Sequence, residues 1–320
     1  MTPRTRSATA LLRTIAWKGA AVAWKGGAVA LLALVAAAGV ADERRAITPF
    51  LWVVEHGDAT LYLYGSIHAA PDEALPPPRF VVDAFDRSDL LVTEILLDEE
   101  ALAAAVFAIA QRVLLPARTT LDQLIGESNA AIIEGFAAEH GLPAEAVRVM
   151  QPWAVELLFA EAAVASADFS TANGLDQWFH DRAVAAAVAR DALETFEDQI
   201  DALAGAPLDE QAASLIQTLD AARTGELEAL YAAWRSGDTE ALAAVMMHAI
   251  GESPESRATY DRLFTDRNRA WIPRLIDYLD AGGTTFVVVG AGHFAGPHNV
   301  IDLLEEAGVV VTRVRDGSGR

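Results

Sequence analysis

The chain has 320 residues, of which 52% are apolar and 22% are charged, so it can bury a large core and does not have the composition of a disordered protein. Its formal net charge is −21 and residues 1–41 contain no acidic residue, so the acidic charge lies after residue 41 and we expect no nucleic-acid partner. The sequence has no cysteine, which excludes disulfides, thiolate metal ligands and cysteine nucleophiles.

Residues 1–41 are typical of an export signal. Basic residues precede the apolar run Gly26–Ala41, and the chain becomes polar from Asp42 onward. A helix of this run would be about 24 Å long, which is short for a bilayer core of about 30 Å. Small residues at Gly39 and Ala41 fit a cleavage site. We expect removal after Ala41 and a periplasmic or extracellular location, with an uncleaved anchor in the inner membrane as the alternative.

The exported part, residues 42–320, is predicted to form one large domain. It begins with two apolar runs around the turn residues His56-Gly57-Asp58, a pattern that predicts a β-hairpin. The second run enters the turn Gly65-Ser66-Ile67-His68, and a proline-rich loop follows. The next elements are a short amphipathic helix near Arg79–Asp86 and a strand at Asp89–Leu96.

The middle of the chain, about residues 99–250, is predicted to be a large helical insertion. It is rich in alanine and has apolar residues at helical spacing. The segment Asp191–Phe196 fits either a short buried strand or the end of a helix. Tyr231, Trp234 and Met246 lie among alanines at this spacing, so we expect them to pack in the core.

The C-terminal part returns to strands and turns. Thr284–Val289 is a continuous β-branched run, typical of a strand that is buried on both faces. It enters the turn Gly290-Ala291-Gly292-His293, which is followed by a helix near Asn299–Ala307 and the strand Val309–Val314. The order strand, Gly-x-x-His, proline, helix, strand therefore occurs twice. The predicted fold is α/β, with a central mixed sheet built from these two repeats and the helical insertion between them.

The two Gly-x-x-His turns are the candidate active site. Ligands of open α/β sheets bind beyond the carboxyl ends of parallel strands, which is where both turns lie. Gly65 and Gly290 permit a tight or positive-φ turn, so that His68 and His293 are exposed to the crevice.

Two further residues carry charge that the site could use. Glu94 is near the end of an apolar strand, where a carboxylate needs a partner. Arg267, on a later helix, could clamp a carboxylate or stabilise an oxyanion.

Several motifs of the chain resemble the TraB/PrgY/GumN family, which is grouped with the Tiki proteins and with erythromycin-esterase-like and ChaN-like proteins. The resemblance covers about residues 49–314. The motifs that carry it are LYLYGSIHAAP, LLVTEI, Gln151-Pro152-Trp153, Gly174-Leu175-Asp176, Leu193-Glu194-Thr195, RNRAW and VVVGAGHFAGP.

The resemblance implies a site and two mechanisms. His68, Glu94, Arg267 and His293 would share one cleft, with Asp176 and Glu194 as supporting residues. In the first mechanism, His68, Glu94 and His293 hold one divalent ion that activates water, as described for Tiki-type proteases; zinc, manganese and cobalt all suit these ligands. In the second, one histidine is the general base and no metal is needed, as in the esterase-like relatives.

The function expected from these features is an exported hydrolase of a peptide, an ester or an envelope-derived substrate. The alternative is a binding protein of the cell envelope that recognises a peptide or assists polysaccharide export without turnover. A structural envelope protein with a vestigial site is the third possibility, since a fold does not fix a function.

Overall fold

The computed structural model describes residues 47–315, apart from 167, 222–225 and 252. The expected signal or anchor at residues 1–41 lies outside the described residues. Within the described ranges, no helix is long and apolar enough to cross a membrane.

The described strands form one mixed sheet of six, which confirms the predicted fold class. Its order is β4-β3-β5-β2-β1-β6. The strands are β1 (Leu51–His56), β2 (Ala59–Ser66), β3 (Leu90–Thr93), β4 (Ala189–Ala192), β5 (Gly283–Gly290) and β6 (Thr312–Val314). β2, β3, β4 and β5 are parallel, whereas β1 is antiparallel to its neighbours β2 and β6. The predicted hairpin is therefore β1 and β2.

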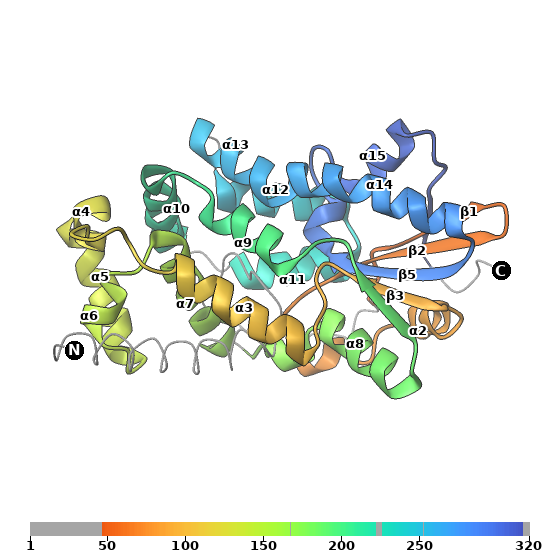
Figure 1. The fold of residues 1–320 in the computed structure, drawn as a ribbon, viewed down its shortest axis with the longest axis horizontal. Coiled ribbons are helices and arrows are strands. Elements are labelled where there is room, and N and C mark those ends of the chain that lie inside the picture. The colour runs from red at the N-terminus through yellow and green to blue at the C-terminus, as the bar shows by residue number, and fades with distance from the viewer. Residues whose placement is uncertain (1–46, 167, 222–225, 252, 316–320) are drawn as a thin grey trace.

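The two predicted repeats meet at the centre of the sheet. β2 and β5 are adjacent and parallel, with Ser66 opposite Gly290. β2 continues through α2 (Arg79–Asp86) to β3, and β5 continues through α15 (Val300–Glu306) to β6. These connections run in opposite directions from the centre, and α2 and α15 cover opposite faces of the sheet (Figure 1). A crevice forms at the carboxyl ends of two such strands, and here both Gly-x-x-His turns begin at that crevice.

Helices fill most of the region between the repeats, as predicted, although β4 interrupts them and pairs with β3 at the sheet edge. The helices before β4 are α3 (Glu99–Arg112), α4 (Leu121–Ile125), α5 (Glu127–Glu139), α6 (Ala144–Val147), α7 (Pro152–Ser166) and α8 (Leu175–Ala186). The helices after β4 are α9 (Phe196–Ala204), α10 (Leu208–Ala221), α11 (Glu226–Ser236), α12 (Thr239–Ile250), α13 (Pro254–Tyr260) and α14 (Asp266–Ala281). The short turns are three 3₁₀ segments, Asp72–Ala74, Thr171–Asn173 and Ala291–Phe294, and a π-helix, Asp261–Thr265.

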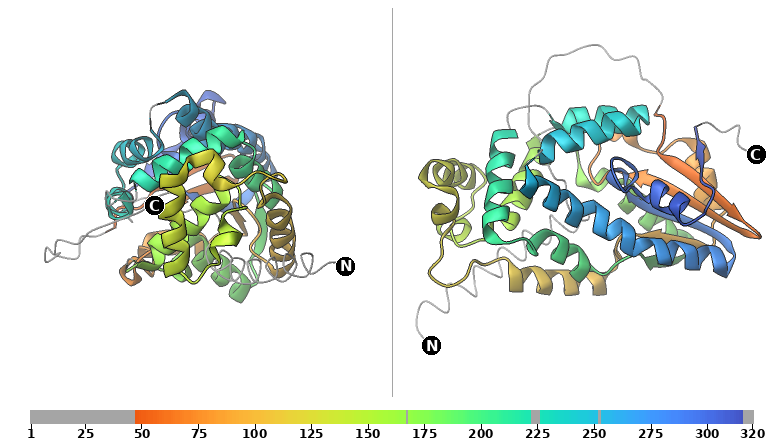
Figure 2. Two further views of the ribbon diagram at one scale, coloured as in Figure 1. Left: turned by 90° about the vertical axis from the view of Figure 1, so that its left-hand side faces the viewer. Right: turned by 90° about the horizontal axis from the view of Figure 1, so that it is seen from above.

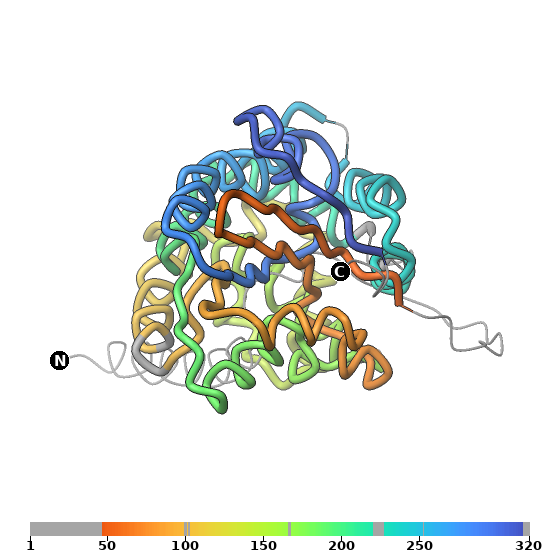
Figure 3. Tube along the Cα trace, turned by 90° about the vertical axis from the view of Figure 1, so that its right-hand side faces the viewer, coloured from red at the N-terminus to blue at the C-terminus, as the bar shows by residue number. Residues whose placement is uncertain are grey.

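The molecule is elongated, with the sheet at one end and helices at the other. α4, α5 and α6 lie farthest from the sheet, as Figures 1 and 2 show. α14 and α15 cover one face of the sheet, and α2 and α8 cover the other (Figures 1 and 3). α9, α11 and α12 lie between the sheet and the distant helices, so they face the carboxyl ends of the strands.

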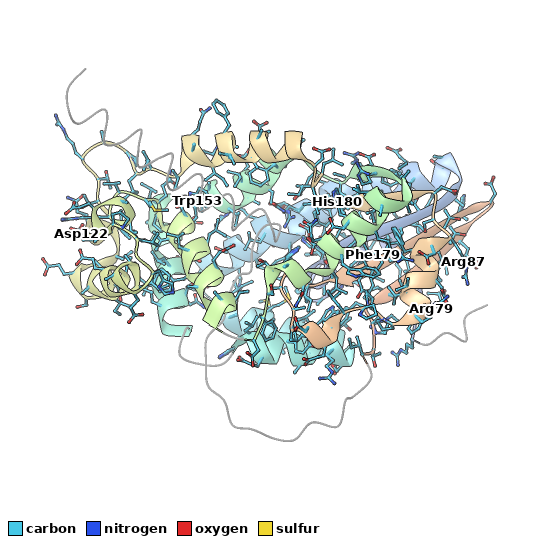
Figure 4. The ribbon with its side chains drawn as sticks, turned by 90° about the horizontal axis from the view of Figure 1, so that it is seen from below. Arg79, Arg87, Asp122, Trp153, Phe179 and His180 are labelled. Atoms are coloured by element: carbon cyan, nitrogen blue, oxygen red, sulfur yellow. The ribbon has the colours of Figure 1, made fainter. Side chains whose placement is uncertain are left out.

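Two apolar cores hold this arrangement. Under the sheet, the rings of Tyr64, Phe85, Phe179 and Phe286 contact one another, and Phe179 on α8 lies on this side in Figure 4. The distant helices have a separate core around Trp153. The expected core residue Trp234 is fully buried, and its Nε1 donates to the carbonyl of Gly65 over 2.9 Å. That bond ties α11 to the start of the first Gly-x-x-His turn.

Candidate active site

The two histidines converge on a single carboxylate oxygen. Nε2 of His68 lies 3.9 Å from Oε1 of Glu94, and Nε2 of His293 lies 3.8 Å from the same atom. Glu94 directly follows β3, whereas the histidines follow β2 and β5. The three groups thus come from the carboxyl ends of three neighbouring parallel strands, as the sequence predicts.

His293 is held as a neutral imidazole. Its Nδ1 lies 2.6 Å from Oδ1 of Asn268, a carboxamide oxygen that can only accept, so we assign the proton to Nδ1. The ring is buried against Trp271 and Phe264, with centroids 4.3 and 5.2 Å away. Burial and the nearby Arg267 lower the pKa of His293 to about 3. Its Nε2 therefore carries a lone pair at neutral pH.

His68 has the opposite charge state. Burial lowers the pKa of His68, but the negative charges of Asp176 and Glu94 outweigh it, and the net pKa rises to about 9. Nδ1 of His68 lies 3.2 Å from Oδ1 of Asp176. At neutral pH the ring is an imidazolium, with its Nε2 facing Glu94.

The motif Gly174-Leu175-Asp176 brings Asp176 to His68. The amide of Leu175 donates to the carbonyl of Ile67 over 3.0 Å. Gly174 approaches the His68 carbonyl so closely that a Cβ would lie 2.7 Å from its oxygen. The start of α8 is thereby docked on the first Gly-x-x-His turn.

Glu94 is ionised despite its burial. Burial raises its pKa, but Arg267 and the two histidines outweigh it, so the pKa is lowered well below the usual range. Oε1 accepts from the amide of Gly290 at 2.7 Å, and Oε2 accepts from Nη2 of Arg267 at 2.6 Å and from Nε2 of Gln199 at 3.2 Å. These donors leave Oε1 facing the two imidazoles.

Arg267 uses every N–H group that a guanidinium has. Nε donates to Glu194 at 3.0 Å; Nη1 donates to the carbonyl of Leu263 at 2.9 Å and to Nε2 of His293 at 3.2 Å. Nη2 donates to Glu94 and Glu194, both at 2.6 Å. The two carboxylates raise the pKa of Arg267 despite its burial. Arg267 lies in the site, as expected, but no N–H remains for the expected direct contact with an oxyanion.

The positions of Arg267 and Glu194 follow from their elements. Arg267 is the second residue of α14, which directly follows the π-helix Asp261–Thr265, an irregularity that is frequent at functional sites. The amide of Glu194 donates to the carbonyl of Glu94 at 2.9 Å, which extends the β3–β4 pairing by one step. Trp271 Nε1 also donates to Oε2 of Glu194, at 3.1 Å. Glu194 therefore supports Arg267 and does not face the histidines.

The motif glycines are needed for space and not for an unusual backbone angle. Gly290 has a φ of −53°, and Gly65 does not have a positive φ either. Of the two expected alternatives, a tight turn or a positive φ, the positive φ is wrong for both glycines. A Cβ on Gly65 would lie 2.7 Å from Cβ of Phe50 and 3.1 Å from Cα of Ala291. A Cβ on Gly290 would lie 3.2 Å from Oε1 of Glu94 and 3.4 Å from Nε2 of His68.

A pocket of about 190 Å³ lies over this site and is partly open to solvent. Its floor is formed by His68, Glu94, Arg267, Gly290 and His293. Ser66 and Gln199 also line it, and both are buried. The Ser66 Oγ and the Gln199 Oε1 have no hydrogen-bond partner among the described residues. A buried polar atom without a partner is costly, so both atoms are available to a ligand. Ser66 could have been found from the sequence, since it follows Gly65 within the motif.

The expected metal ligands lie together, with Nε2 of His68 and Nε2 of His293 3.9 and 3.8 Å from Oε1 of Glu94. In this arrangement Nε2 of His293 accepts from Arg267, and Nδ1 of His68 faces Asp176. Within the described part of the chain, no group of three or more His, Asp or Glu residues has the geometry of a metal site. The divalent ion therefore stays a prediction, and no chemical step below is drawn through it.

Comparison with known proteins shows the family. Residues 50–313 match the sequence profile of the TraB/PrgY/gumN family. The chain belongs to this family. A protein of Treponema pallidum (strain Nichols) that is called only "Uncharacterized protein" is 22% identical over 273 residues, which cover 80% of each chain. No solved structure matches.

In this member of the TraB/PrgY/gumN family, the six side chains expected at the site form one contiguous network. They are His68, Glu94, Asp176, Glu194, Arg267 and His293. Sequence reasoning missed Asn268, Gln199 and Ser66. Asn268 lies beside Arg267 in the sequence, but only the fold shows that it contacts His293. His180, by contrast, is buried on α8 under the sheet (Figure 4) and lines none of the described site.

Proposed function

We propose that this protein is an exported hydrolase of ester or peptide bonds, which uses one protonated and one neutral histidine. The observation that carries the proposal is that both Nε2 atoms face the same oxygen of Glu94, at 3.9 and 3.8 Å. An acid and a base on either side of one small space are the groups that hydrolysis of an acyl bond needs. Export is part of the proposal because residues 1–41 are typical of a signal.

The space above Gly290 is where the reacting carbonyl and water would meet. A Cβ there would be within 3.8 Å of Glu94, His68 and His293. The imidazolium of His68 and the free hydroxyl of Ser66 are the groups that can donate to the carbonyl oxygen as negative charge develops on it. Arg267 holds the two carboxylates and His293 in place.

The proton transfers follow from the charge states. His293 is the neutral base. When water replaces Nη1 of Arg267 at Nε2 of His293, this nitrogen takes a proton from the water as the water oxygen bonds to the carbonyl carbon. Glu94, 3.8 Å away, stabilises the imidazolium that forms. As the bond to the leaving oxygen or nitrogen breaks, His68 gives its proton to that atom. Transfer of the proton from His293 to His68 then restores the starting state.

A hydrolysis panel tests the proposal. The full-length chain would be assayed on peptides and nitrophenyl esters, with His68→Ala and His293→Ala as the variants and the exposed His140→Ala as the matched control. We expect turnover by the wild type and by His140→Ala, and a loss of at least about 100-fold in both site variants. Metal content, measured on the same samples, tests the predicted ion.

The alternative, a binding protein without turnover, has its own outcome in the same panel. It is favoured if no substrate is cleaved and a peptide still binds after both substitutions. Equal activity of all four proteins would contradict the proposed site.

A further inference from the structure

The walls of the pocket above the histidines are apolar. Leu203 of α9, Leu227 and Leu230 of α11 and Leu242, Met246 and Ile250 of α12 line it. Met246 was expected in the core, and it is buried, but its side chain also borders this space. The polar groups gather at the floor, so a ligand would place its reacting group below and an apolar group between these helices.

No charged side chain among the described lining residues lies in the apolar walls, so none there can bind a charged end of a substrate. The cations lie at the floor: His68, which faces the reacting group and Asp176, and Arg267, whose N–H groups are all engaged. The acid in the lining is Glu94, which already accepts from Arg267 and Gly290. A carboxylate or ammonium group in this pocket would lose its hydration without gaining a partner, which is costly.

We infer that the pocket selects substrates with an uncharged, apolar acyl group of about six carbons. The inference rests on the proposed function, because it assigns the acyl side of the bond that the site would cleave. The size follows from the pocket volume of about 190 Å³. For comparison, an apolar cavity of about 150 Å³ holds a benzene molecule.

A series of p-nitrophenyl esters tests the selection with the full-length chain. For acyl chains from two to ten carbons, kcat/KM rises about threefold to fourfold for each added methylene, because each buries apolar surface. The rise stops near six carbons, when the pocket is full. The glutarate monoester, which carries a carboxylate, is cleaved at least about tenfold more slowly than the pentanoate. A flat series, or equal rates for these two esters, would overturn the inference.

Matched leucine variants locate the selection in the pocket wall. Leu230 lines the pocket and is partly buried, whereas Leu157 on α7 is also partly buried but lies against the distant core. Leu230→Arg supplies a cation and reverses the preference toward the glutarate monoester. Leu230→Ala lowers kcat/KM for the hexanoate ester several-fold, and Leu157→Ala leaves it unchanged. Equal effects of the two alanine variants would contradict the assignment.

A binding measurement separates this inference from the proposed function. Hexanamide and adipic acid monoamide present the same chain with and without a charged end, and calorimetry measures both without turnover. We expect hexanamide to bind at least about tenfold more tightly, and Leu230→Arg to remove the difference. If this holds while no ester is cleaved, the hydrolase proposal fails and the apolar selection stands. If esters are cleaved but the amides bind equally, the selection fails alone.

Discussion

Replacing Gly290 with alanine should abolish activity while the fold survives. The added methyl group would lie 3.2 Å from Oε1 of Glu94, 3.4 Å from Nε2 of His68 and 3.8 Å from Cδ2 of His293, which is the space proposed for the reacting groups. The backbone at Gly290, with a φ of −53° and a ψ of 135°, suits alanine without strain. The close neighbours are side-chain atoms, which can move by a few tenths of an ångström.

Gly290→Ala should affect stability less than activity. Slight overpacking against side chains should cost less than about 2 kcal/mol of the free energy of unfolding. Displacing the water and the carbonyl should lower kcat/KM at least about 100-fold, or about 2.7 kcal/mol of transition-state stabilisation. Steady-state hydrolysis and denaturant unfolding of the same preparation measure both quantities.

Two further glycines provide controls for this prediction. Gly65→Ala places Cβ 2.7 Å from Cβ of Phe50, so it should lower stability more than Gly290→Ala does. Gly135→Ala, on α5, meets nothing within 4 Å and should stabilise the helix by up to about 1 kcal/mol without affecting activity. The reasoning is refuted if Gly290→Ala remains active, or if it loses activity only because it unfolds.

Three other predictions concern the polar groups around the site. Ser66→Ala should lower kcat/KM about 10- to 100-fold with little change in melting temperature, because its hydroxyl has no hydrogen-bond partner to lose among the described residues; unchanged kinetics would remove Ser66 from the site. Asn268→Asp should raise the pKa of His293 above about 3, because a carboxylate beside Nδ1 favours the imidazolium; an NMR titration checks this. The free energy of unfolding should depend on pH because of the low pKa of His293. The stability that neutral His293 contributes is fully present above pH 6.5, the ordinary pKa of histidine. It is lost as pH falls toward about 3, because the unfolded chain binds the proton at a higher pH than the folded chain does. Roughly 3–5 kcal/mol should be lost over that window, and His293→Gln should not show this part of the loss.

Much of the fold could be predicted because its signals are local. The β-branched run before Gly290 and the alternating run before Gly65 each end in a turn with a histidine, so the sequence alone marks the strand ends. The helix Arg79–Asp86 was predicted with its observed bounds, since its apolar spacing is regular and prolines precede it. The sequence of Asp191–Phe196 fits either a short strand or the end of a helix. The structure has the last two residues of β4 at one end of this segment and the first residue of α9 at the other.

The site was predictable only as a set of residues, because its chemistry depends on contacts between distant segments. The charge state of His68 comes from Asp176, and that of His293 from burial and Arg267. Neither contact has a signal in sequence spacing. The role of Arg267 could not be predicted for the same reason, because Glu194, which lies 73 residues away in the sequence, accepts hydrogen bonds from two of its nitrogens. The glycines show a similar limit, since a need for space depends on what the fold places beside them.

The central claim is that the two site histidines have opposite charge states across Glu94, and imidazole NMR of the full-length protein tests it directly. His68→Gln and His293→Gln would assign the two rings among the seven histidines. We predict that at pH 7.5 His68 is an imidazolium that titrates near pH 9, and that His293 is neutral, protonated on Nδ1, and remains so well below pH 6.5. If both rings titrate near their ordinary value, or both are neutral and bound to a metal ion at pH 7.5, the assignment of acid and base is contradicted.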